Sequence, residues 1–340
     1  MARYSNNLNV VIGIHESGLY AGSITASTFW IGQVQSHTSD SSEGLIEERF
    51  LGQADRNFGL LVQGPRDVTG TLTYHPTDMR LVFWSIGSTT SVSGTTTQGM
   101  AVREIEPNER LSPYTSGALN PPISFAIEDT KVSAGTGQNF KKIVRGIVPN
   151  TSTLRATQWE KVEVTVDYLA NVLNFGSSAN TTFVEVTRTP YLWNNTSITL
   201  GGSSVDTAKE VEFIIDNSRT SPHYLNGSRD GSIPFDGNRN YTLNVTVDLD
   251  GVYSKRLYSE YFQGGSSFNV TLDLNADNTA GSQHTIFYMS GCRITEMETP
   301  SELEGVSESS ITIRPQTVTG SEFNFFTSGA VYGPWWLYSY

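Results

Sequence analysis

Residues 64–87 read GPRDVTGTLTYHPTDMRLVFWSIG, and their hydrophobic period changes midway. In the first part, Val68, Leu72 and Tyr74 lie an even number of residues apart with threonines between them, as on one face of a β-strand. The second part has helical spacing, with apolar residues at i, i+3, i+4 and i+7: Met79, Val82, Phe83 and Ile86. Gly87 can adopt a positive φ and end this helix. The stretch predicts a strand that leads into a short amphipathic helix.

The same order recurs in residues 237–264, GNRNYTLNVTVDLDGVYSKRLYSEYFQG. Apolar and polar residues alternate strictly through its first part, which predicts a second strand. Asp250 is placed to cap a helix, and Gly264 is placed to end it. The apolar side of this predicted helix carries Leu257, Tyr258, Tyr261 and Phe262. The chain therefore contains the strand-to-helix unit twice.

Other residues match between the two halves in the same order. Two pairs lie 173 positions apart: Gly64 with Gly237, and Arg66 with Arg239. Two further matches share a separation of 145: residues 123–127 with 268–272, and Gly146 with Gly291. A single match would arise by chance, but an ordered series around the same structural switch predicts an internal duplication.

The duplication and the turn-rich composition predict a mainly β fold, with one short α-helix per repeat and two tandem β-sandwich domains. Residues 1–28 are polar and rich in Gly, Ser and Thr, and we interpret them as an N-terminal arm. The first domain is expected at 29–176 and the second at 177–340, joined through the linker-like residues 174–182. The second domain ends in an aromatic tail, FNFFTSGAVYGPWWLYSY, which is expected to dock against protein.

Bulk properties exclude several classes of function. The net charge of −12 argues against a nucleic-acid-binding surface, which requires clustered Lys and Arg. The single cysteine, Cys292, excludes an intrachain disulfide and a multi-cysteine metal site. We find no pattern of a signal peptide and no apolar run long enough to span a membrane. An acidic protein can still lie next to DNA if its task is to avoid binding it.

A catalytic constellation is not apparent in the sequence. The five histidines are scattered, and the common motifs for zinc, phosphate or nucleophile chemistry do not occur. Residues 273–277 resemble the start of a calcium loop but lack its glycine and its final acidic residue, so a turn is the better interpretation. We therefore expect no enzyme activity, no cofactor and no metal.

Residues 88–120 form an insertion in the first copy that the second copy lacks. Their charges alternate in sign, as suits pairing across an interface, and two apolar residues provide an anchor. The residues expected at an interface are Val102, Arg103, Glu104, Ile105, Glu106, Glu109 and Arg110. We expect this loop to be mobile in the free subunit. Its deletion is expected to leave a folded protein that no longer stacks into tubes.

The order of strands and helices resembles the tail tube proteins of long-tailed phages and archaeal tailed viruses. The similarity runs from about residue 30 to 318 and is carried by five stretches: WIGQVQS, RFLGQADRNF, GPRDVTGTLTYHPTDMRLVFWSIG, GIVPNTSTLRATQWEKVEVTVDY and SGCRITEMETPSELEGVSESS. It rests on order and spacing, because this family has no diagnostic short motif. The resemblance implies sandwich-like domains whose sheets join into a β-barrel, and rings of barrels that stack through a long loop.

The same resemblance implies a virion location and a set of partners. The protein would assemble in the host cytoplasm into trimeric rings with pseudo-six-fold symmetry, because each chain holds two copies of the domain. Terminator, tape measure and distal tail proteins would be its neighbours, and viral DNA would pass through an acidic lumen without specific binding or membrane contact. Two strand carboxylates, Glu163 and Asp167, are candidates for that lumen.

Two other classes of function remain open from the sequence. One is a secreted or surface-exposed tandem β-sandwich that binds a sugar or a peptide, as an adhesin does. The other is a different virion component, such as a tail-tip or capsid protein.

Overall fold

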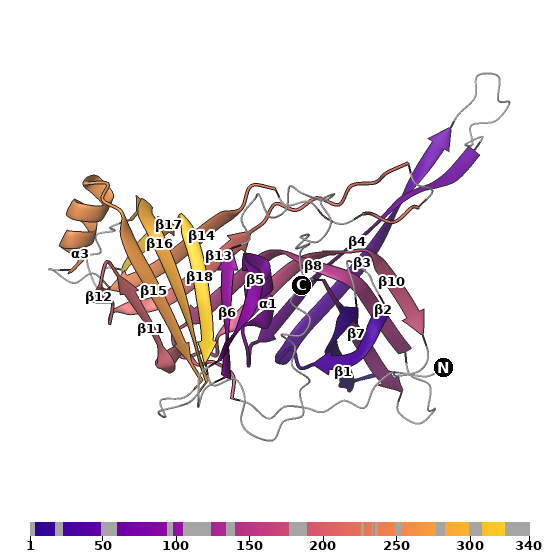
Figure 1. Cartoon of the computed structure of the whole chain (residues 1–340), viewed down its shortest axis with the longest axis horizontal. Helices are drawn as coiled ribbons and strands as arrows, with labels where there is room; N and C mark the ends of the chain where they lie inside the picture. Colours follow the sequence, from indigo (N-terminus) through magenta and orange to yellow (C-terminus); the bar gives the residue numbers. More distant parts are fainter. Residues whose placement is uncertain are drawn as a thin grey trace.

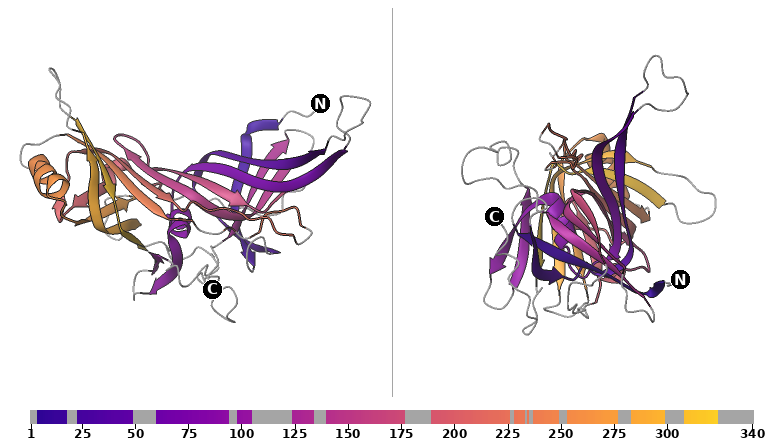
Figure 2. Two further views of the ribbon diagram at one scale, coloured as in Figure 1. Left: turned by 90° about the horizontal axis from the view of Figure 1, so that it is seen from above. Right: turned by 90° about the vertical axis from the view of Figure 1, so that its right-hand side faces the viewer.

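The computed structural model describes residues 4–17, 23–48, 60–93, 98–104, 124–133, 140–176, 189–225, 228–232, 234, 237–248, 253–276, 283–298 and 308–323. The fold is mainly β, as predicted, and all strand pairs are antiparallel. The molecule is elongated (Figure 1), with the second half of the chain at one end and β1, β2, β7 and β10 at the other. The long strands run along this axis (Figure 2).

The strands form three connected sheets. We call the first the central sheet; its spatial order is β3 (Gln33–Glu48), β4 (Leu60–His75), β9 (Glu163–Ala170), β8 (Phe140–Thr157), β13 (Ala208–Asp216), β14 (Asn240–Asp248), β17 (Glu308–Arg314) and β16 (His284–Met297). The first outer sheet has the order β2 (Ser23–Phe29), β1 (Tyr4–Ser17), β7 (Phe125–Ser133), the start of β8, and β10 (Val172–Gly176). The second outer sheet has the order β12 (Ser203–Ser204), β11 (Thr196–Leu200), β15 (Phe268–Asn275), the start of β16, β18 (Thr317–Phe323), β6 (Gln98–Glu104) and β5 (Gly87–Ser93).

The topology repeats between the halves. β3-β4-β9-β8 corresponds to β13-β14-β17-β16, and in each unit the last strand begins in an outer sheet and ends in the central sheet. The crossing points are Gly146 and Gly291, both with positive φ (67° and 63°). The irregularities in strand register also correspond. β8 has one between Pro149 and Thr151, and β16 has one between Ile294 and Glu296, 145 positions later.

One predicted match is wrong by two residues. β7 and β15 each have an irregularity in their pairing with the next strand, after Phe125 and after Phe268. Phe125 therefore corresponds to Phe268 at a separation of 143, not 145. The predicted match of Ile123 with Phe268 assumed the same separation, 145, that relates Gly146 to Gly291. The segment between the two strands differs in length by two residues between the halves, so that separation does not hold for β7 and β15.

The N-terminal arm is also a wrong prediction. β1 pairs with both β2 and β7 in the first outer sheet, and its Ile12 and Ile14 are buried. The Gly/Ser/Thr-rich composition concealed a strand whose partners lie far along the chain. The element that does project is the ribbon formed by β3 and β4, which extends beyond the central sheet (Figure 1) and exposes Leu45, Ile46 and Val62.

The two predicted helices differ in geometry and burial. α1 (Arg80–Ile86) follows β4 as expected, and every one of its residues is buried. The second begins as α3 (Tyr253–Arg256) and continues as the π-helix η2 (Leu257–Gln263), which ends before Gly264. A short 3₁₀ turn, η1 (Trp193–Asn195), precedes β11. The π register buries Leu257 and Tyr261 and leaves Tyr258 exposed, so the predicted four-residue apolar side is only half correct.

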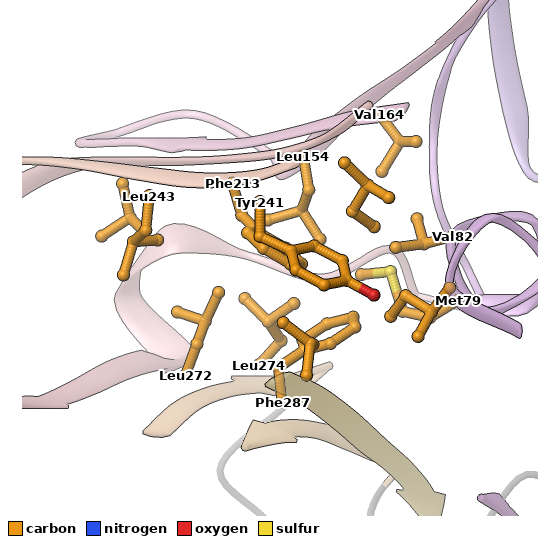
Figure 3. Packing of buried hydrophobic residues seen from close by; sticks show 14 of the residues in the cluster. Met79, Val82, Leu154, Val164, Phe213, Tyr241, Leu243, Leu272, Leu274 and Phe287 are labelled. Carbon is orange, nitrogen blue, oxygen red and sulfur yellow. The ribbon is translucent and has the colours of Figure 1, made fainter. Parts of the chain in front are cut away.

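Both halves contribute to one hydrophobic core (Figure 3). Phe83 of α1 contacts Phe287 of β16 edge-on, with ring centroids 5.6 Å apart, and Phe287 also contacts Phe213 of β13 at 5.7 Å. The C-terminus of α1 is bound from the second half, because Asn217 donates to the Ser85 carbonyl and Arg239 donates to the Ile86 carbonyl. Of the predicted linker at 174–182, residues 174–176 belong instead to β10, and residues 177–182 lie outside the described residues. The boundary itself remains a prediction, but the core is shared across it.

A buried carboxyl group lies at this junction. Glu322 of β18 is fully buried and accepts hydrogen bonds from the Tyr191 hydroxyl (2.8 Å) and the Gln283 amide (2.7 Å). Burial, together with the neighbouring Asp78 carboxylate, raises the pKa of Glu322 to about 7.

This raised pKa predicts a pH-dependent stability. The folded state holds a proton on Glu322 up to about pH 7, whereas the unfolded chain releases it near pH 4.5, so stability falls as pH rises through this window. In Glu322→Gln the uncharged amide removes this slope. We expect the variant to gain about 2–3 kcal/mol relative to the wild type between pH 5 and pH 8, measured by urea unfolding. Glu296→Gln, at an exposed position, is the control; equal pH profiles for all three proteins would contradict the prediction.

Candidate functional site

The most distinctive surface is the face of the central sheet that points away from the core, which we call the outward face. Strand residues opposite one another share a face, so the register identifies its members. One row runs through Thr73, Thr165 and Thr153 on β4, β9 and β8. Another row crosses Glu163, Arg155 and Glu212 and continues through Asn244, Thr312 and Glu296. The outward face therefore continues without a break across both halves.

The outward face is rich in threonine and strongly acidic. Its carboxylates are Asp40, Asp67, Glu163, Asp167, Glu210, Glu212, Asp216, Asp248, Glu296, Glu298 and Glu308. Its basic residues among those described include Arg155, Lys209, Arg293 and Arg314. Carboxylates thus outnumber cations several-fold, and the hydroxyl groups between them keep the surface polar.

Local contacts orient many of these groups. Thr71 donates to Asp167 at 2.6 Å, and Asn244 donates to Glu212 at 2.9 Å. Both halves therefore hold carboxylates in place through cross-strand polar neighbours.

Two of the cations on this face, Arg155 and Lys209, are already engaged with its carboxylates. Arg155 pairs with Glu210 at 2.5 Å, and this hydrogen bond raises the pKa of the arginine. Lys209 binds Asp248 at 2.7 Å and Glu308 at 2.5 Å, and these bonds raise the pKa of the lysine. These cations are offset by the residues that they touch, so the outward face as a whole presents negative charge to solvent.

The chemistry that this face supplies is electrostatic repulsion and hydration. Groups of three or more His, Cys, Asp or Glu side chains arranged to hold a metal do not occur in the described part of the chain. A surface of this charge repels phosphate groups, because its carboxylates outnumber the cations that could replace the counterions of a polyanion. Short threonine side chains keep the sheet surface smooth and solvated.

Glu163 and Asp167, predicted from the alternation in β9, both lie on the outward face. Sequence analysis missed its acidic members in the second half, including Glu212, Asp216 and Glu296. The signal was present, since strict alternation in residues 210–216 and 240–248 separates the two faces in the same way.

The interface residues predicted in the insertion fall into two groups. Val102, Arg103 and Glu104 belong to β6, which pairs with β5 and with β18 of the same chain. The expectation of a loop throughout 88–120 is therefore wrong for residues 88–93 and 98–104. It failed because the partner strand, β18, lies more than two hundred positions away. Ile105, Glu106, Glu109 and Arg110 lie outside the described residues.

Comparison with known proteins returns no family. The chain matches no protein-family model and no curated protein. Within the described residues, we find no helix with the length and apolar character needed to cross a membrane.

Proposed function

We propose that this chain is a tail tube subunit of a long-tailed phage or archaeal tailed virus. The outward face would line a tube through which the viral genome passes into the host. The observation that carries the proposal is the continuous, acidic, threonine-rich face of the central sheet. A channel for DNA requires such a wall, because like charges keep a polyanion from adhering.

The duplicated topology supports a ring of three chains. Each half supplies four strands to the central sheet, so three chains would supply six equivalent units around a pseudo-six-fold axis. Rings would stack into a tube within the virion tail, after assembly in the host cytoplasm. Tail terminator, tape measure and distal tail proteins would contact its ends. The subunit would be structural, with no enzymatic role.

Negative-stain electron microscopy of the purified protein tests this directly. We expect hollow tubes or rings, and native mass spectrometry of single rings should give three chains of 37.3 kDa. Lone monomers that bind a sugar or peptide would favour an adhesin-like module instead. Closed shells would indicate a capsid component, and rings of six chains would refute the trimeric arrangement.

The acidic face also gives a prediction about DNA retention. In Asp167→Lys/Glu296→Lys, two exposed positions of the outward face become basic. Wild-type tubes should not retain double-stranded DNA at low salt, whereas the variant should retain it and release it as salt rises. The control is Asp206→Lys/Glu160→Lys, which changes charge equally at exposed turns outside the face. Equal retention by the two variants would show that the outward face is not the channel wall.

A further inference from the structure

The contact between the two halves of one chain provides a template for a contact between two chains. Within the chain, β8 of the first half pairs with β13 of the second, with Thr153 opposite Ile214. Beside this pairing, α1 of the first half covers β16 and β18 of the second outer sheet, where Phe83 meets Phe287. The junction thus combines strand pairing with aromatic packing.

Each component of this junction has an unused counterpart at an end of the molecule. β16 corresponds to β8, and beyond Cys292 it pairs only with β17 among the described strands. β3 corresponds to β13, and it pairs only with β4 within the same described set. The two strands form the opposite edges of the central sheet. An open edge of this length presents unpaired backbone groups that favour pairing with another strand.

Exposed aromatic pairs lie at the same two ends. Tyr258 and Phe262 of η2 contact each other at 5.6 Å, and Tyr258 is 38% exposed. At the other end of the molecule (Figure 1), Phe140 of β8 and Phe175 of β10 contact each other at 5.7 Å and are 36% and 64% exposed. Large aromatic side chains exposed in pairs are typical of protein interfaces.

The second half shows what covers the position of Phe140 and Phe175. Their counterparts, 145 positions later, are Thr285 and Gly320, and both are buried. Thr285 is covered by Tyr191, and Gly320 pairs with β6 of the first half. The surface that is covered at the intrachain junction therefore has an exposed counterpart at one end of the molecule. In that counterpart, Phe140 and Phe175 stand in place of the smaller Thr285 and Gly320.

We propose that two copies of this chain associate head to tail through these ends. Tyr258 and Phe262 of one copy pack against Phe140 and Phe175 of the next, while β16 of the first copy pairs with β3 of the second. This contact rests on the proposed function only in being the one that closes the ring. The observations that support the contact come from the duplicated topology. A head-to-tail contact closes into a ring when the rotation between copies divides a full turn.

The duplication also fixes the register. β3 and β13 share an irregularity, between Val34 and Ser36 and between Ala208 and Glu210, at a separation of 174. Within the chain, Thr153 lies opposite Ile214. The counterpart of Thr153 on β16 is Glu298, 145 positions later, and the counterpart of Ile214 on β3 is Asp40, 174 positions earlier. The duplication therefore places Glu298 opposite Asp40 of the next copy. Met297 then lies opposite Ser41, and Glu296 opposite Ser42. The two facing carboxylates repel each other, so association should strengthen with added salt and in Asp40→Asn.

Disulfide cross-linking tests the register in the full chain. Asp40→Cys/Glu298→Cys should cross-link between copies on mild oxidation, and the products on a non-reducing gel should end at three chains. Ser36→Cys/Glu298→Cys, on the same face but out of register, is the negative control. Thr153→Cys/Ile214→Cys reports the reactivity of the equivalent pair within one chain. Two results would overturn the register. One is equal cross-linking of Asp40→Cys/Glu298→Cys and Ser36→Cys/Glu298→Cys. The other is no cross-linking of Asp40→Cys/Glu298→Cys under conditions in which Thr153→Cys/Ile214→Cys reacts.

A second variant tests the aromatic contact without touching the fold's core. Phe175→Ser should leave the folded monomer intact and weaken association at least tenfold in sedimentation velocity. Tyr288→Ser, at a 48% exposed aromatic position that belongs to neither aromatic pair, should not change association. An unchanged association constant for Phe175→Ser would overturn the aromatic part of the contact.

Failure of this inference is separable from failure of the proposed function. If microscopy shows tubes but cysteines at positions 40 and 298 do not cross-link, the tail tube function is supported and this contact is wrong. Cross-linked trimers that never stack into tubes would keep the contact and remove the tube.

Discussion

Phe287→Ala should lower the free energy of unfolding by about 3–5 kcal/mol, the range for removing a buried phenylalanine. The ring is fully buried and contacts Phe83 from the first half and Phe213 from the second. Alanine leaves a cavity between the halves, and Phe213 is held by its contact with Tyr241 and cannot fill it without losing that contact. Because the core is shared, we expect the whole chain to unfold in one transition at a lower urea concentration.

The neighbouring residue provides the control. Tyr288 is the next residue on β16 but points to solvent, and Tyr288→Ala should change stability by no more than about 1 kcal/mol. The informative contrary result is a curve with two transitions, only one of which moves in Phe287→Ala. That result would mean that each half folds on its own core and that the aromatic junction forms after folding.

The sequence was sufficient wherever the evidence lay inside one segment. The change from period 2 to helical period in residues 64–87 gave both β4 and α1, and repetition of this pattern gave β14 and the second helix. Glu163 and Asp167 followed from simple alternation. These features depend on residues only a few positions apart, so a pattern can reveal them.

Features that depend on distant partners were not predictable in this way. β1 is a buried strand because β7, more than a hundred positions later, lies beside it. β6 is a strand because β18 offers an edge in the other half. η2 buries Tyr261 as predicted but leaves Tyr258 exposed, and periodicity alone does not distinguish its π geometry from an α-helix. The outward face likewise required the register, since alternation in one strand does not show which strands it joins.

The structure changes the expected result of deleting the insertion. Removing residues 88–104 removes β5 and β6, which pack against α1 and cover the edge of β18 from Gly320 to Glu322. We expect this deletion to lower the free energy of unfolding by at least about 2 kcal/mol, because a ladder and its packing are lost. The bare β18 edge should also cause concentration-dependent aggregation.

A replacement that keeps the connection separates folding from stacking. Exchanging residues 105–121 for a Gly/Ser linker of the same length keeps β5, β6 and the path to β7, so the fold and the ring should survive, with wild-type stability in urea and three chains per ring by native mass. If these residues join successive rings, this variant should form single rings in the microscope and no tubes. Tubes of normal length would exclude them as the connector and leave the exposed Leu45, Ile46 and Val62 of the β3–β4 ribbon as the next surface to mutate. Wild-type stability in the 88–104 deletion would show instead that β18 does not need its partner.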